Sequence, residues 1–127
     1  MLICVKKVGQ DLDFKRVLSP SSEDFKAIIG ATTLTTRKIN ENITCLYDFD
    51  NLETDKEYNF VLLEEVKCDY DLIDAIKGTV VFVREDENGK FLDLEEEDVS
   101  YLIVNYMKNT CIEVNTKNKY DTLEIFA

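Results

Sequence analysis

The apolar residues of this chain fall into short runs, and turn-forming residues separate most of them. The runs at 2–8 and 13–18 are joined by a glycine-containing turn, and those at 32–39 and 43–47 by a turn at 40–42. Short apolar or β-branched runs joined in this way predict β-hairpins. Further strands are predicted at 58–63, 79–83, 110–115 and 121–126.

Helical signals interrupt the predicted strands at three places. A serine followed by two acids within 19–24 predicts a helix start, and Gly30 fits the end of that helix. A short helix is predicted at 71–77, and the clearest one at about 95–108. The apolar stripe of this last helix consists of Val99, Leu102, Ile103, Tyr106 and Met107.

Hairpins with interspersed helices and no β-α-β alternation favour the α+β class. The chain has 127 residues and no low-complexity linker, so we expect a single α+β domain over 1–127. Its core is expected to be an antiparallel sheet of hairpins with two or three helices.

The negative charge of the chain is concentrated in its middle. Residues 48–98 hold 18 of the 26 Asp and Glu but only five of the 15 Lys and Arg, and the net charge is −11. A one-sided negative field repels nucleic acid and attracts cations or basic protein surfaces. We therefore expect a basic protein partner and no direct contact with nucleic acid.

The composition excludes several kinds of active site. There is no histidine, which removes Ser-His-Asp and Cys-His nucleophile activation and histidine ligands for zinc. The two glycine-rich phosphate-binding patterns, G-x-x-x-x-G-K-[ST] and G-x-G-x-x-G, do not occur. The four cysteines lie far apart without a C-x-x-C pair, so we interpret them as reduced, buried side chains. We expect no enzymatic activity and no cofactor.

The clustered carboxylates leave one metal-binding alternative open. The acids at 48–57 alternate like cation ligands, but they lack the glycine and the final glutamate of a helix–loop–helix calcium site. Residues 85–96 depart from the same template. We interpret both segments as solvated acidic loops and keep a carboxylate-based metal or ligand site as an alternative.

The strongest candidate site lies on both sides of the turn predicted at 86–89. Acids in the first turn of a helix stabilise it by ~0.3–1 kcal/mol each, but the five acids at 93–98 exceed that need and repel one another. If the hairpin forms, both acidic groups emerge near one end of the sheet, where acids at 48–50 or 64–65 are candidates to join them. The expected partner-binding residues are Glu85, Asp86, Glu87, Asp93, Glu95, Glu96, Glu97 and Asp98.

The segment 76–98 carries a recognisable pattern. It reads Ile-Lys-Gly-Thr-Val-Val-Phe-Val, then Asp86-x-x-Gly-x-Phe-x-Asp93-Leu-x-x-Glu-Asp. The pattern resembles the C-terminal signature of a small uncharacterised domain family of phages, plasmids and conjugative elements, and the similarity covers about residues 1–107. Asp93 and Glu95 stand where that family tends to have Ser and Thr. The resemblance implies an α+β accessory protein of a mobile element and implies no activity.

These observations together predict a non-enzymatic interaction protein. Its acidic face would imitate DNA phosphates and occupy the Lys and Arg side chains of a nucleic-acid-handling host protein, such as a restriction or CRISPR nuclease. Two alternatives stay open, namely acidity that serves only solubility and the carboxylate-based metal or ligand site.

The sequence gives no sign of a membrane protein. No apolar run approaches the ~20 residues that span a bilayer. The apolar stretch at the N-terminus precedes its lysines and is too short for a signal peptide. We expect a cytoplasmic protein without membrane contacts.

Overall fold

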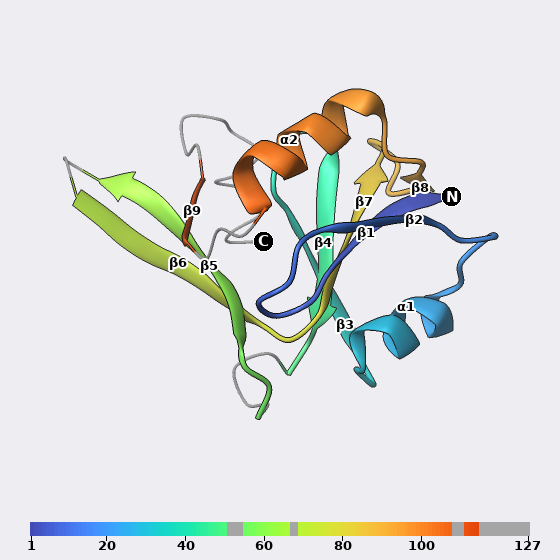
Figure 1. Ribbon diagram of the computed structural model, residues 1–127, viewed down its shortest axis with the longest axis horizontal. Coiled ribbons are helices and arrows are strands. Elements are labelled where there is room, and N and C mark those ends of the chain that lie inside the picture. Colours follow the sequence, from blue (N-terminus) through green and yellow to red (C-terminus); the bar gives the residue numbers. More distant parts are fainter. Residues whose placement is uncertain (51–54, 67–68, 108–110, 115–127) are drawn as a thin grey trace.

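The computed structural model describes residues 1–50, 55–66, 69–107 and 111–114, which form two sheets and two helices (Figure 1). In the main sheet the strands are ordered β2 (Asp13–Arg16), β1 (Leu2–Lys6), β7 (Val80–Glu85), β4 (Ile43–Asp48) and β3 (Leu34–Lys38), and β8 (Phe91–Leu92) pairs with β7. The smaller sheet contains β6 (Asp69–Lys77), β5 (Tyr58–Val66) and β9 (Cys111–Val114). All pairs are antiparallel except β5 with β9. The α+β class and the hairpins β1–β2, β3–β4 and β7–β8 are thereby confirmed.

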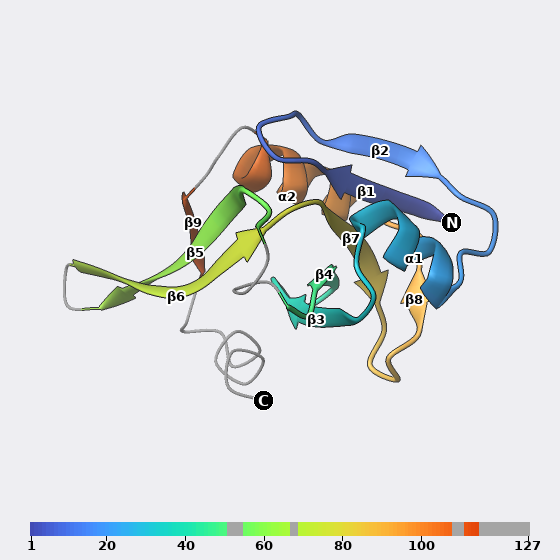
Figure 2. The same ribbon diagram turned by 90° about the horizontal axis from the view of Figure 1, so that it is seen from below.

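The two helices, α1 (Ser22–Ile29) and α2 (Glu96–Tyr106), cover opposite faces of the main sheet (Figures 1 and 2). Alternate residues of the central strand β7 point to opposite faces, as the pleat requires. Phe82 packs in the core with Leu102 and Tyr106 of α2. Val81 packs in the second core with Phe25 of α1. Neither helix within the described ranges is long and apolar enough to cross a membrane.

Both helices begin at residues that complete their backbone hydrogen bonds. Ser21 accepts a hydrogen bond from the Asp24 N–H, Asp24 accepts one in return from the Ser21 N–H, and Gly30 ends α1 with a φ of 76°. This confirms the helix predicted from the 19–24 pattern. The 95–108 helix is also confirmed, although Ile103 and Met107 of its expected apolar stripe are exposed.

The short helix predicted at 71–77 is wrong, because these residues belong to strand β6. The apolar residues of this segment fit helical and extended spacing equally well over so short a run. Pairing with β5 along almost its whole length selects the extended form. Gly78, with a φ of 74°, turns the chain from β6 into β7 and does not cap a helix. The strand predicted at 121–126 lies outside the described residues.

A buried polar contact joins the two sheets. The Lys6 ammonium donates to the Asn59 side-chain oxygen at 2.7 Å, and the Asn59 amide donates to the carbonyls of Lys6 and Gly78. Both side chains are buried. Burial lowers the pKa of Lys6, since a charged amine is poorly solvated there. This contact fixes the start of β5 against the end of β1.

Lys56 connects three further parts of the fold. Its ammonium donates to the carbonyls of Ile29 and Gly30 at the end of α1 and forms an ion pair of 3.2 Å with the nearly buried Asp48. A cation at this position also interacts favourably with the negative end of the helix. The Lys56 stem lies against Gly78, where a Cβ atom would be only 2.5 Å from its Cδ.

Candidate functional site: an acidic groove beside the β7–β8 hairpin

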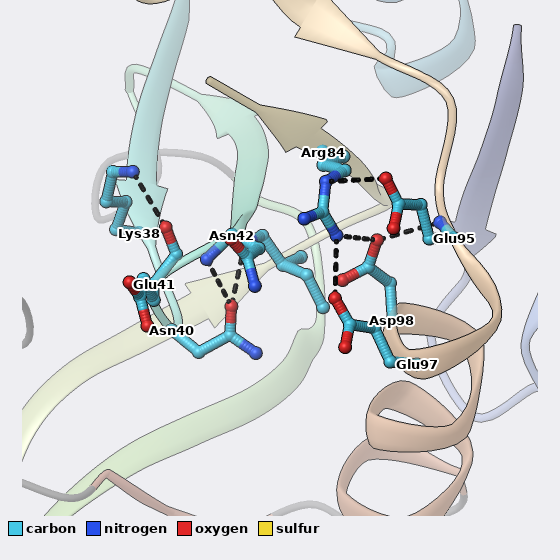
Figure 3. Close-up of polar contacts among 9 residues, drawn as sticks. Lys38, Asn40, Glu41, Asn42, Arg84, Glu95, Glu97 and Asp98 are labelled. Atoms are coloured by element: carbon cyan, nitrogen blue, oxygen red, sulfur yellow. Dashed lines mark hydrogen bonds and ion pairs between the residues drawn. The ribbon is translucent and has the colours of Figure 1, made fainter. Parts of the chain in front are cut away.

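Three segments distant in sequence meet at one end of the main sheet. The register pairs Ile43 with Arg84, and the Glu85 N–H donates to the Asn42 carbonyl at 2.9 Å. This places the β3–β4 turn beside the end of β7, with the start of α2 close by (Figure 3). Between them lies an open groove of about 430 Å³, which we call the acidic groove. Its lining residues are Lys38, Glu41, Asn42, Arg84, Glu85, Asp86, Glu87, Leu92 and Glu95.

Arg84 organises the acids at the start of α2. Its guanidinium lies 2.7 Å from the Asp98 carboxylate, 3.3 Å from Glu97 and 3.4 Å from Glu95. Figure 3 shows the three carboxylates converging on this one cation. The hydrogen bond with Asp98 is the main reason why the pKa of Arg84 is raised. The repulsion expected among these acids is therefore partly offset within the fold.

Two of the eight expected partner-binding residues are used by the fold itself. Asp98 is only 2% exposed, and besides Arg84 it accepts the N–H of Glu95, which closes the first turn of α2. Asp98 thus has the role of the N3 residue in a capping box, whose side chain accepts the N–H of the N-cap residue. Asp93 accepts the Leu2 N–H at 2.7 Å, although its side chain is largely exposed. Because Asp98 is buried, it is not available to a partner. The hydrogen bond with Leu2 gives Asp93 a structural role that accounts for an acid at this position.

Glu85 and Asp86 are half-buried residues of the groove wall. Glu85 accepts the Thr44 hydroxyl at 2.6 Å. Asp86 accepts the N–H groups of Asn88 and Lys90, both at 2.9 Å, and so stabilises the hairpin turn. These hydrogen bonds fix the positions of the two carboxylates.

The remaining four expected residues face solvent. The side chains of Glu95 and Glu97 are 61% and 66% exposed in spite of their contacts with Arg84. Glu87 and Glu96 are exposed as well. Four of the eight expected acids, Glu85, Asp86, Glu87 and Glu95, line the groove, and Arg84 links Glu95 to Glu97 and Asp98. Glu87, Glu95, Glu96 and Glu97 are accessible to solvent.

The acids at 48–50 and 64–65 do not join this group. The β4–β7 register places Ile43 beside Arg84, so Asp48 lies at the opposite end of β4, where it pairs with Lys56. The outer half of the β5–β6 hairpin, which contains Glu64 and Glu65, extends from the other side of the molecule (Figures 1 and 2). The expectation that they converge is wrong, because it ignored strand order.

Sequence reasoning missed two charged residues of the groove, Lys38 and Glu41. Glu41 lies exposed in the β3–β4 turn, and the Lys38 ammonium donates to its carbonyl at 3.3 Å. The Asn40-Glu41-Asn42 turn was recognisable in the sequence. Its position beside β7 was not, because it depends on the pairing of β4 with β7.

Most of the side chains that line the groove are charged. Five carboxylates and two cationic side chains line the groove. Among the residues that the structure describes, no group of three or more Asp, Glu or Cys side chains is arranged to hold a metal ion. The described residues therefore give no support to the alternative of a carboxylate-based metal site.

The two cysteines with described side chains, Cys4 and Cys45, are buried and form no disulfide. Cys4 and Cys45 pair with Phe82 from opposite sides, so a strand separates them. Two strand spacings amount to about 9–10 Å between Cα atoms, more than a disulfide can bridge. Burial raises the pKa of Cys4 to about 12. For these two residues, the interpretation as reduced core side chains is confirmed.

Comparisons with protein-family models, with curated proteins and with solved structures found no match for this chain. The resemblance to a family of mobile genetic elements therefore stays a prediction.

Proposed function

We propose that this chain is a non-enzymatic interaction protein whose acidic groove binds a basic protein surface. In its specific form, the partner is a nucleic-acid-handling host protein, such as a restriction or CRISPR nuclease. The chain would then act as an inhibitor from a phage or other mobile element, and would occupy the Lys and Arg side chains that otherwise contact DNA phosphates.

The observation that carries the proposal is the convergence of carboxylates from separate segments. Glu41 comes from the β3–β4 turn, Glu85 and Glu87 from the β7–β8 hairpin, and Glu95 from the start of α2, and all four line one groove. Hydrogen bonds of the turns and of the helix start fix the backbone that carries them. A preorganised array loses little conformational entropy on binding.

The predicted binding mode is electrostatic and therefore sensitive to salt. Exposed charges are screened over a Debye length of ≈ 8 Å at physiological ionic strength. Complementary charge raises the association rate more than it raises the final affinity. A partner that approaches through Lys and Arg should therefore bind fast at low salt and weakly at high salt.

The test compares two variants with the same change in net charge. The groove variant carries Glu41→Lys and Glu87→Lys at two exposed lining residues and Glu96→Lys at the exposed residue that follows the lining Glu95. The control variant carries Asp13→Lys, Glu23→Lys and Asp55→Lys, which are exposed elsewhere. Asp98 is left unchanged because its reversal would disrupt the fold.

Each immobilised protein is used to capture proteins from a bacterial lysate at about 50 mM and about 200 mM salt, the range over which phosphate-type contacts weaken strongly. Captured nucleases are purified and assayed for displacement of fluorescent duplex DNA. We expect wild type and control to capture a nuclease and displace its DNA, and the groove variant to do neither.

Two results would contradict the proposal. Equal capture by wild type and groove variant would show that the groove is not the binding surface. Failure of wild type to capture any DNA-binding protein at low salt would favour the alternative in which the acidity serves solubility.

A further inference from the structure

The turn between β7 and β8 contains the single Asn-Gly pair of the sequence, Asn88-Gly89, among nine asparagines. Asparagine is one of the thermally labile residues of proteins. A following glycine leaves the backbone nitrogen unhindered and conformationally free. We propose that Asn88 is a site of spontaneous deamidation and that its conversion alters the β7–β8 hairpin. The inference is independent of the proposed function.

The reaction needs only water and base. When a solvent base has removed the proton of the Gly89 amide, its nitrogen attacks Cγ of Asn88. A bond forms between this nitrogen and Cγ, the bond between Cγ and Nδ2 breaks, and ammonia leaves with a proton taken from water. Water then opens the cyclic imide at Cγ to give aspartate, or at the main-chain carbonyl carbon to give isoaspartate. One water is consumed in total, one ammonia is released, and nothing is oxidised or reduced.

The structure makes the reacting atoms accessible. Asn88 and Gly89 are both exposed, and a Cβ built on Gly89 would meet only the Glu85 carboxylate, at 3.7 Å. One obstacle is the hydrogen bond that the Gly89 N–H donates to the Asp86 carbonyl at 3.1 Å. It must open before the nitrogen can attack.

The hairpin can open because its second strand is very short. β8 consists of Phe91 and Leu92, and its register with β7 comprises two pairs. Strand ends with few pairs and exposed hydrogen bonds open at low free-energy cost. Asn59 and Asn105 provide a contrast, since Asn59 is buried and the Asn105 amide donates to the Tyr101 carbonyl.

The two products should affect the turn differently. Aspartate adds a carboxylate next to Asp86 and Glu87 without changing the backbone. Isoaspartate also inserts a methylene group between residues 88 and 89. Asp86 accepts the N–H groups of Asn88 and Lys90, on either side of that link. The longer backbone would therefore displace Lys90 from Asp86 and weaken the β8 pairing that follows.

Peptide mapping tests the modification directly. The protein is incubated in mildly alkaline buffer and then cleaved after Lys and Arg, which releases residues 85–90 with Asn88 as their one asparagine. We expect this peptide to gain the mass of an amide-to-acid change while the peptides with Asn59 and Asn105 stay unchanged. An isoaspartate-specific methyltransferase then identifies the isoaspartate fraction. A synthetic peptide of residues 85–90 reports the intrinsic rate.

The inference is overturned if the synthetic peptide is converted while Asn88 in the protein stays intact, since the hairpin would then protect it. Hydrogen exchange tests the structural consequence. Asn88→Gln serves as the control variant that has no asparagine to deamidate at this position. Asn88→Asp should keep the protection of the Phe91 and Leu92 amides, and the isoaspartate form should lose it. Equal protection in both would refute the proposed effect on the hairpin.

Discussion

Replacing Asp98 by alanine is expected to destabilise the fold by about 3 kcal/mol. The Asp98 carboxylate is 2% exposed and has two different partners. It lies 2.7 Å from Nη1 of Arg84, and it accepts the backbone N–H of Glu95 at 2.8 Å. Removing it eliminates an ion pair and a helix cap at the same time.

The magnitude follows from these two contacts. Breaking a buried ion pair by removing one partner costs about 3–5 kcal/mol, because the other charge is left uncompensated. Here Arg84, 16% exposed, keeps Glu95 and Glu97 as partners, so the loss should amount to about 2 kcal/mol. Loss of the hydrogen bond from the Glu95 N–H, which belongs to the capping box of α2, adds about 1 kcal/mol. The sum is the predicted 3 kcal/mol, to which cavity formation adds little at a short side chain.

Urea unfolding monitored by circular dichroism measures the effect as a shift of the midpoint at constant slope. Glu97→Ala is the matched control, because it removes a mostly exposed partner of the same Arg84 and should cost less than about 1 kcal/mol. Asp98→Asn should fall between the two, since its amide oxygen can still accept one hydrogen bond. A loss below about 1 kcal/mol for Asp98→Ala would refute the structural role assigned to this residue.

Three further perturbations test other parts of the fold. Lys56→Met should cost about 2 kcal/mol, because it leaves the nearly buried Asp48 without this cation and frees the carbonyls at the end of α1, and thermal unfolding measures it. Gly78→Ala should cost at least about 1–2 kcal/mol in the same assay, because the turn requires a φ of 74° and the added Cβ would lie 2.5 Å from Cδ of Lys56; an unchanged melting temperature would refute this geometry. The pKa of Cys4, raised to about 12 from 9.0, makes the folded state hold a proton that the unfolded state loses, so stability should fall as pH rises from about 9 towards 12. Cys4→Val should flatten that fall in urea titrations at several pH values, and Cys4 should resist thiol reagents until the protein unfolds.

Local signals in the sequence predicted the parts of the fold that local interactions determine. The Ser21–Asp24 capping pair and the Asn-Gly turn act within a few residues, and both structures form as expected. The wrong prediction of a helix at 71–77 arose because a long-range contact decides the structure of this segment. Its apolar spacing allows a helix and a strand equally, and pairing with β5 selects the strand. Which strands become neighbours is a global property, so the order β1-β7-β4 was not predictable from any single segment.

In the candidate site, too, local features were predictable from the sequence and long-range ones were not. Acids on either side of one turn were expected to emerge together, and four of the eight, Glu85, Asp86, Glu87 and Glu95, line one groove. The contribution of Glu41 and the burial of Asp98 depend on the β4–β7 register and on Arg84, which lies 14 residues before Asp98. Sequence spacing carried no sign that one arginine would take up three of the expected acids.

Arg84 also limits what a partner can gain at this surface. A cation that approaches Glu95 or Glu97 is the second cation for a carboxylate already paired at 3.3–3.4 Å. Exposed pairs of this kind are worth only about 0–1 kcal/mol, so Arg84 does not prevent such a contact, but it reduces its benefit. The carboxylates with most to contribute are therefore exposed ones without a contact to Arg84, namely Glu41 and Glu87 in the groove and Glu96, which follows the lining residue Glu95. They lie on three different segments, so a partner that uses all three must recognise the folded groove and not a linear acidic stretch.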